Sequence, residues 1–163
     1  MTLMAAIRPD AWNLPLFLHI LGAMVLVGTL VLVAASLVGA WRGGSVGAVR
    51  LGFRGLLLAA LPSWVVTRVT AEWLVSEENL DEDPPGWVDA GYMISDTTFV
   101  LLVAATVCAG VAARRTARVQ AGSGRSGRAG AGSAGLGRAV VVLVGIALAA
   151  YVVAIWAMAT KPS

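Results

Sequence analysis

The chain of 163 residues contains a single cysteine, Cys108, and a single histidine, His19. One cysteine excludes an intrachain disulfide, and its place within an apolar run favours an inert buried thiol. Metal centres usually need sets of three or four histidines, cysteines or carboxylates at close spacing, and we find no such motif. We also find no nucleophile paired with a base and no phosphate-binding loop. The sequence therefore predicts neither a metal site nor an enzyme.

Charged residues are scarce as well, at 13% of the chain against 58% hydrophobic residues. Soluble domains usually carry about 25% charged residues, and here the apolar residues gather in long runs. This composition predicts an integral membrane protein with one domain over residues 1–163. The net charge of +3 does not indicate a nucleic-acid partner, because the arginines cluster in two segments between the apolar runs.

Four of the apolar runs are long enough to cross a bilayer as helices, which takes about 20 residues each. We place the spans at residues 14–40, 51–75, 90–113 and 139–159. The first run is too long for the apolar core of a signal peptide, so we predict a true span. The predicted fold class is all-α: an integral membrane four-helix bundle with up-down antiparallel order.

The segments between the spans differ in charge. Residues 41–50 form a short glycine-rich turn with arginines and no acid, and residues 114–137 have the composition of a flexible linker. The segment from Glu77 to Asp83 is acidic. Since arginine-rich connections stay in the cytoplasm, we expect residues 41–50 and 114–138 on that side. The acidic segment and both termini are then outside, in a multi-pass protein of the plasma membrane.

Two charges, Arg68 and Glu72, lie inside the second span. A charge at the centre of a helix costs about 2.5–3.5 kcal/mol on insertion, so we expect such groups to be paired and to face the interior. Trp64, Arg68 and Glu72 follow one another at intervals of one turn, which lets the guanidinium pair with Glu72 and lie over Trp64. Pro62 removes a backbone donor and is expected to kink this helix, which would free a carbonyl near residue 58 inside the bundle.

Two polar residues of other spans are predicted to lie at the depth of Arg68. Counted from the outer span ends, His19, Asp96 and Arg68 lie about five, six and seven residues in, or roughly 8–10 Å. Small residues one turn after His19, Gly22 and Ala23, turn the His19 face toward a neighbouring helix. The predicted binding cluster consists of His19, Arg68, Glu72 and Asp96, with Trp64 as an aromatic partner.

Three hypotheses for the function remain open. In the first, the protein is an accessory or structural bundle that the polar cluster locks. In the second, the cluster binds or transports a small solute or a proton from the outside. Our cofactor prediction is none, but in the third hypothesis the protein binds haem or copper at His19. Haem would then need Met24, another methionine or the His19 of a second copy as its other ligand.

The partners expected from the sequence are the lipid bilayer and a second copy or a larger membrane protein. The last span carries a face of small residues that suits helix association. These residues are Ala147, Ala150, Ala154 and Ala157.

The stretch H-I-L-G-A-M-V-L-V-G, from His19 to Gly28, resembles the first span of copper-resistance D-type membrane domains, in which an outer-end histidine precedes small residues. The stretches R-V-T-A-E-W-L, from Arg68, and G-Y-M-I-S-D, from Gly91, look like parts of actinobacterial four-span membrane proteins of unknown function. The resemblance implies a four-helix bundle and kinship with haem or copper proteins.

Overall fold

The structure is a computed structural model that describes residues 13–43, 46–78, 85–121 and 126–159. Within these ranges all regular structure is helical, which confirms the predicted all-α class. Four helical stretches are long and apolar enough to cross a membrane, and each covers one predicted span or nearly all of it. They are Asn13–Ala40, Gly47–Glu77, Gly86–Arg118 and Gly135–Ala157.

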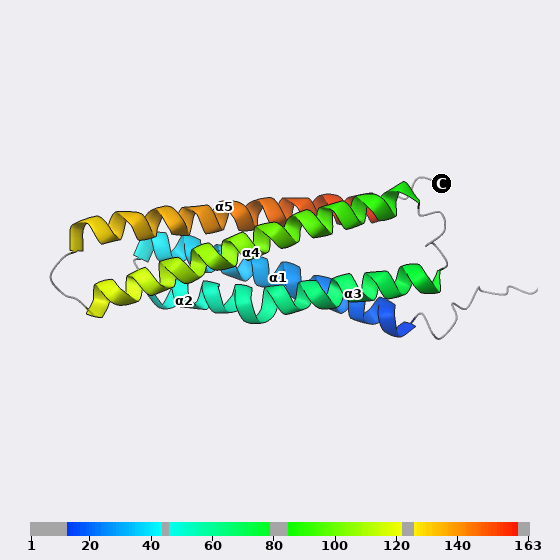
Figure 1. Ribbon diagram of the computed structural model, residues 1–163, viewed down its shortest axis with the longest axis horizontal. Helices are drawn as coiled ribbons and strands as arrows, with labels where there is room; N and C mark the ends of the chain where they lie inside the picture. Colours follow the sequence, from blue (N-terminus) through cyan, green and yellow to red (C-terminus); the bar gives the residue numbers. More distant parts are fainter. Residues whose placement is uncertain (1–12, 44–45, 79–84, 122–125, 160–163) are drawn as a thin grey trace, which may run out of the picture.

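The four crossings run in alternating directions (Figure 1). The first is α1 (Asn13–Gly43), and the second joins α2 (Val46–Gly55), η2 (Leu56–Ala60) and α3 (Leu61–Glu77). The third is α4 (Gly86–Ala121) and the fourth is α5 (Ser126–Ala159). α4 packs along α5, while α1 packs against the second crossing and also against α5. The up-down antiparallel bundle is the architecture that the sequence predicted, in a protein of multi-pass membrane type.

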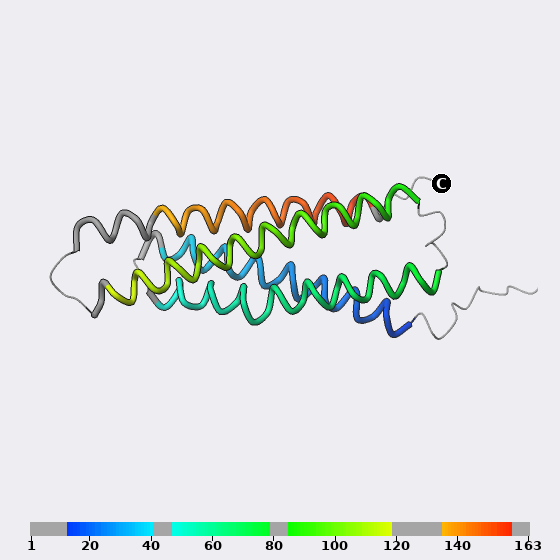
Figure 2. The backbone as a smooth tube through the Cα atoms, in the orientation of Figure 1, coloured from blue at the N-terminus to red at the C-terminus, as the bar shows by residue number. Residues whose placement is uncertain are grey.

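Pro62 shapes the second crossing through the π-helical turn η2. The backbone N–H of Leu61 bonds to the carbonyl of Leu56, five residues back instead of four. Proline has no N–H, and its ring would clash with the carbonyl of Leu58 in a regular helix, so a wider turn before it relieves the conflict. The backbone still runs without a break from α2 into α3 (Figure 2). The disruption expected near residue 58 is therefore present as a π-helical turn.

The prediction of a flexible linker over residues 114–137 was wrong for the part that the structure describes. α4 continues to Ala121 and α5 begins at Ser126, and only residues 122–125 lie outside the described residues. Residues 112–121 are rich in alanine and arginine, which favour the helix, so α4 extends beyond its apolar run. With 36 residues it is about 54 Å long, against about 30 Å for the hydrocarbon core of a bilayer.

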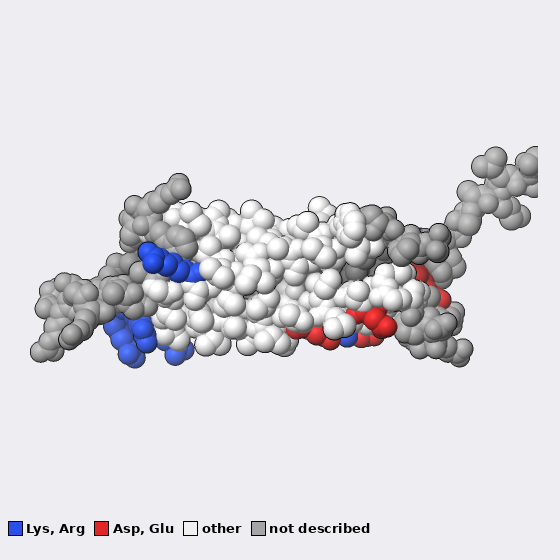
Figure 3. Space-filling view, turned by 90° about the horizontal axis from the view of Figure 1, so that it is seen from above, with Lys and Arg blue, Asp and Glu red and all other residues white. Residues whose placement is uncertain are grey.

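Charge separates the two ends of the bundle (Figure 3). The arginine end carries Arg50, Arg54, Arg114, Arg115, Arg118 and Arg138. The acidic end carries Glu72, Glu77, Glu78, Asp89 and Asp96. Apolar side chains such as Met24 and Val152 cover the flanks between the ends, where lipid surrounds a membrane bundle.

The closely packed core fills the middle of the bundle and its half toward the arginine end. Fully buried leucines from three crossings meet there, among them Leu30 of α1, Leu56 of η2 and Leu102 of α4. Small residues of α4 and α5 complete the cluster, such as Ala109 and Ala147. These buried apolar side chains form a continuous core on this side of the bundle.

α1 and α3 meet closely at Gly22. A Cβ atom at this position would lie 2.6 Å from Oγ1 of Thr67 and 3.4 Å from the backbone carbonyl oxygen of Ser63. Such distances leave no room for a side chain, so glycine is what lets the two helices approach. The prediction that the His19 face is turned toward a neighbouring helix is confirmed.

The alanine face of α5 is turned inward, which contradicts its predicted role as a free association face. Ala147 and Ala154 are 1% and 8% exposed. Ala150 and Ala157 are partly buried. These small residues serve the packing of α5 within the chain, because α5 needs them to lie close to α1 and α4. A dimer would have to use another face.

Gly22→Ala should separate α1 from α3 and lower the free energy of unfolding by about 1–3 kcal/mol, as overpacking generally does. Thermal unfolding of the purified protein in mild detergent measures the change. Gly28→Ala is the matched control, since a Cβ there meets nothing within 4 Å. Equal unfolding midpoints for the two variants would contradict the close approach.

Candidate functional site

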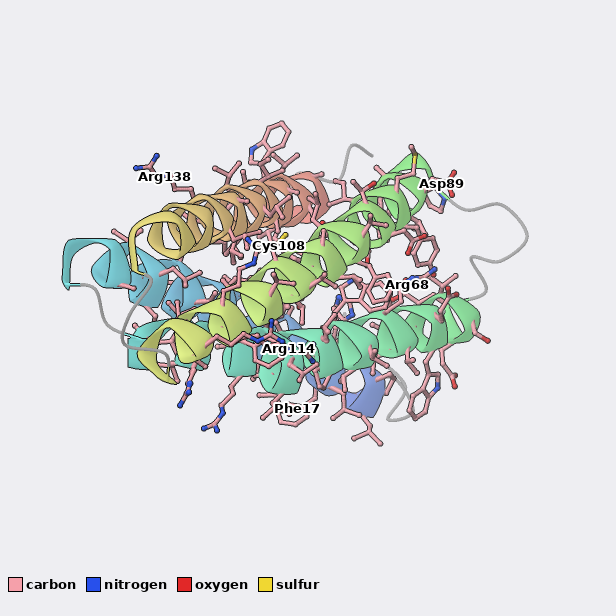
Figure 4. The ribbon with its side chains drawn as sticks, turned by 60° about the vertical axis from the view of Figure 1, so that its left-hand side comes forward. Phe17, Arg68, Asp89, Cys108, Arg114 and Arg138 are labelled. Carbon is pink, nitrogen blue, oxygen red and sulfur yellow. The ribbon has the colours of Figure 1, made fainter. Side chains whose placement is uncertain are left out.

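Arg68 ties α3 to α4 near the acidic end (Figure 4). Its guanidinium pairs with Glu72, one turn further along α3, and its Nε lies 3.3 Å from Oδ1 of Asp96 in α4. Tyr92 completes the group, because its hydroxyl donates to Oε2 of Glu72 at 3.2 Å. The Tyr92 ring also lies 4.2 Å from the guanidinium carbon. The structure thus confirms the predicted network of Arg68, Glu72 and Asp96.

The network lies on the flank of the bundle, and the expectation of charges facing the interior was wrong for the carboxylates. The side chains of Glu72 and Asp96 are 55% and 62% exposed, whereas that of Arg68 is 22% exposed. A carboxylate near the end of a helix loses less free energy when water or head groups reach it than when it is buried. Ion pairs between exposed groups contribute only about 0.2–1 kcal/mol, so the network is a weak lock.

Trp64 does not lie beneath Arg68, which corrects the predicted contact between them. Its indole N–H donates to the carbonyl of Ser95 at 3.1 Å, and its ring stacks on Phe99 with 4.3 Å between centroids. Tyr92 takes the place under the guanidinium. It precedes Asp96 by four residues and so lies on the same face of α4, a spacing from which the sequence could have revealed it.

A cavity of about 280 Å³ lies between α1, α3, α4 and α5 at the acidic end. α4 packs against α2 more extensively than against α3, so the two helices separate toward this end and the cavity remains between them (Figure 1). Its lining is mainly apolar and includes Leu16, Ala71 and Ala154. The polar residues that reach it include His19, Arg68, Tyr92 and Tyr151.

His19 is oriented by the backbone of α3. Its Nδ1 lies 3.0 Å from the carbonyl oxygen of Thr67. Because a carbonyl can only accept, Nδ1 carries the proton, and in the neutral ring Nε2 is then a hydrogen-bond acceptor. Among the described residues Nε2 has no hydrogen-bond partner. The close approach at Gly22, one turn further along α1, makes this contact possible.

His19 therefore lies beside the network, as the sequence predicted, but is not bonded to it. The residue that it contacts, Thr67, is next to Arg68, and both His19 and Arg68 line the cavity. Glu72 and Asp96 do not belong to the residues that line it. The equal depths estimated from the span ends are confirmed by the contacts, while the four predicted residues divide into a cavity part and an outer part.

Tyr151 is a cavity residue that the sequence did not reveal. It lies in α5, within the predicted span 139–159, which has no charged residue. Its hydroxyl oxygen is buried with no hydrogen-bond partner in the described part of the chain. A buried polar group left without a partner costs about 1–3 kcal/mol. Such groups usually have a reason in a bound molecule or water.

The orientation of His19 is one that metal-binding histidines adopt, since they donate their other N–H to a carbonyl. The described residues that line the cavity include no methionine or second histidine as the other axial ligand for haem, however. Met24 is 68% exposed on the outside of the bundle, and neither methionine nor cysteine is found among the described residues that line the cavity. The described residues also contain no group of three or more metal-ligand side chains. The residues of one copy do not fit haem or a multi-ligand copper centre.

Comparison with known proteins adds no further constraint on the site. No family model, no curated protein and no solved structure matches the chain significantly. The chemistry of the site has to be inferred from its geometry, which offers an oriented histidine in a mainly apolar cavity and a buried tyrosine hydroxyl beside it.

His19 is the chain's one histidine, so a ¹⁵N spectrum of the imidazole reports on this site alone. We expect a proton on Nδ1 and none on Nε2, because the Thr67 carbonyl requires a donor. Solid-state NMR of the histidine-labelled protein in lipid measures this. Gly22→Ala serves as the control, because loss of the contact between His19 and Thr67 should give a mixture of the two imidazole tautomers. A wild-type ring protonated on Nε2 alone would contradict the geometry.

Proposed function

We propose that the protein is a small-molecule binding protein of the plasma membrane, with its ligand in the cavity lined by His19 and Tyr151. The supporting observation is His19 in the cavity lining: its Nδ1 is held by the Thr67 carbonyl, and its Nε2 has no hydrogen-bond partner among the described residues. Ligand pockets are typically about 300–1,000 Å³, lined by apolar residues with a few placed polar groups. The cavity, at about 280 Å³, is near the lower limit and suits a molecule of one ring.

The orientation in the membrane follows from the two ends. Positive charge stays on the cytoplasmic side, so the arginine end is cytoplasmic and the acidic end is outside. Both termini then lie outside, and residues 41–50 and 114–138 face the cytoplasm. The cavity opens in the outer half of the membrane, where solutes of the outer leaflet reach it.

Binding is a better proposal than transport across the membrane. The buried leucines at Leu30, Leu56 and Leu102 close the bundle between the cavity and the arginine end. A polar solute or a proton needs a continuous polar path, and an apolar core is costly to cross for either. The cavity thus supports capture of a molecule at the outer side.

A structural role is the second candidate, and the tie between Arg68 and Asp96 favours it. This tie joins α3 to α4 where the two helices separate. In such an accessory bundle the network would fix the helices and the cavity would hold no specific molecule. A homodimer or a larger membrane partner stays a prediction, as does kinship with copper-resistance D-type domains through residues 19–28.

A cysteine placed in the cavity should react with a thiol reagent from outside. In a Cys108→Ala background, Ala154→Cys should be labelled by a membrane-impermeant methanethiosulfonate in intact cells, because Ala154 lines the cavity. Ala147→Cys is the matched control, two turns away in the same helix, buried in the core and unlabelled. If Ala154→Cys resists both this reagent and a membrane-permeant maleimide although the purified variant is folded, the cavity is closed from water and from lipid, and the binding proposal fails.

A reporter that fluoresces only in the cytoplasm should be active when it is inserted between α4 and α5 and inactive at the C-terminus. The arginines beside the α4–α5 connection keep the inserted reporter in the cytoplasm, whereas a reporter at the C-terminus is on the outer side. Whole-cell fluorescence, normalised to protein amount by immunoblot, measures the difference. The reverse pattern would overturn the orientation.

A further inference from the structure

We infer that the molecule bound in the cavity is a neutral, membrane-soluble hydroxyl compound, of which the phenols are the simplest aromatic class. The inference rests on the proposed function and specifies its ligand. It follows from the proton position on His19, from the charges around the cavity and from the buried hydroxyl of Tyr151.

The head group has to donate a hydrogen bond. The Thr67 carbonyl holds the proton of His19 on Nδ1, so Nε2 offers a lone pair. A ketone, an ester or an ether has acceptors alone and cannot bond to Nε2 in this mainly apolar cavity. A hydroxyl, by contrast, donates to Nε2. An acceptor held in place by a second bond discriminates strongly between ligands with and without the donor.

The ligand has to be neutral. Arg68 is already compensated by Glu72 and Asp96, and the two carboxylates exceed its single charge. Glu78 lines the same cavity and adds further negative charge. An anion is therefore repelled. A cation would leave water for a mainly apolar lining in which Arg68 is also present, and Glu78 is the carboxylate that could compensate it there, so the charged probe below tests this alternative directly.

Tyr151 is a second polar residue of the cavity lining. Its hydroxyl oxygen is buried with almost no accessible surface and has no partner among the described residues. A ligand therefore reaches this oxygen only after the Tyr151 side chain turns toward the cavity. An oxygen that has donated its proton to Nε2 keeps two lone pairs and can then accept from the Tyr151 hydroxyl.

The test uses a matched pair of probes, 4-ethylphenol and its methyl ether 4-ethylanisole, which differ in the hydrogen-bond donor. The full chain is reconstituted in lipid nanodiscs, and binding is measured by calorimetry against empty nanodiscs. We expect the phenol to bind about tenfold more tightly than the ether, the size of one buried hydrogen bond. The ¹⁵N resonance of Nε2 should shift with the phenol and not with the ether.

Two variants and two charged probes complete the test. In His19→Phe the preference for the phenol should vanish, and in Tyr151→Phe it should fall by a smaller factor. 4-Ethylbenzoate and 4-ethylbenzylammonium should bind more weakly than the phenol. The shift of Nε2 is measured on the wild type, so the inference remains testable even where a variant does not fold.

Equal binding of phenol and ether in the wild type would overturn the inference and leave the binding proposal standing. Tighter binding of the ammonium probe would overturn it in favour of a cationic ligand. If none of the probes binds although Ala154→Cys is labelled, the ligand class is wrong and the cavity is still accessible. If none binds and Ala154→Cys is unreactive, the proposed function fails together with its ligand.

Discussion

The approach of α1 to α3 at Gly22 is the constraint on which the acidic end depends. Without a side chain there, the two backbones come near enough for Nδ1 of His19 to reach the Thr67 carbonyl at 3.0 Å. That bond fixes the ring, its proton and the direction of its free nitrogen together. A wider spacing would leave His19 as a polar side chain facing lipid, with nothing to decide which nitrogen is protonated. The chemistry of the cavity therefore begins with the absence of one methyl group.

The bundle is built differently in its two halves, and the second crossing shows where the change occurs. Toward the arginine end, α2 packs against α1 and α4, and Leu56 lies in the closed core. The π-helical turn η2 and Pro62 follow, and beyond them α3 stays with α1 while α4 stays with α5. π-Helical turns are frequent at functional sites because they redirect the side chains that follow. Here the turn separates α2, which packs beside the closed core, from α3, which lines the cavity.

The sequence predicts the features that depend only on position along the helix axis. Four spans follow from the length of the apolar runs, and the meeting of Arg68 with Asp96 follows from their equal depth. Rotation about the helix axes is a different matter, because periodicity is weak in helices that are apolar on all sides. For this reason the prediction that Trp64 lies under Arg68 was wrong, since Tyr92 lies there. The predictions that the α5 alanines face outward and that Glu72 and Asp96 face inward were wrong for the same reason. The helices over residues 114–121 and 126–137 were missed because low apolar content there resembled a linker. Alanine and arginine favour the helix over residues 114–121, whereas the glycine-rich residues 126–137 have low helix propensity and their helix has no explanation in the sequence.

Two ties border the cavity, and they differ in what they leave available. The tie between Arg68 and Asp96 joins Nε to Oδ1, and its carboxylate is exposed on the flank. The tie between His19 and Thr67 uses one nitrogen and leaves the other with its lone pair. The first can hold α4 in place and so set the width of the cavity, whereas the second supplies a chemical group within it. A structural bundle needs the first tie alone. The Tyr151 hydroxyl, buried without a partner among the described residues, adds nothing to stability and costs free energy as long as no molecule bonds to it. That cost is the physical reason to favour a bound molecule over an empty bundle.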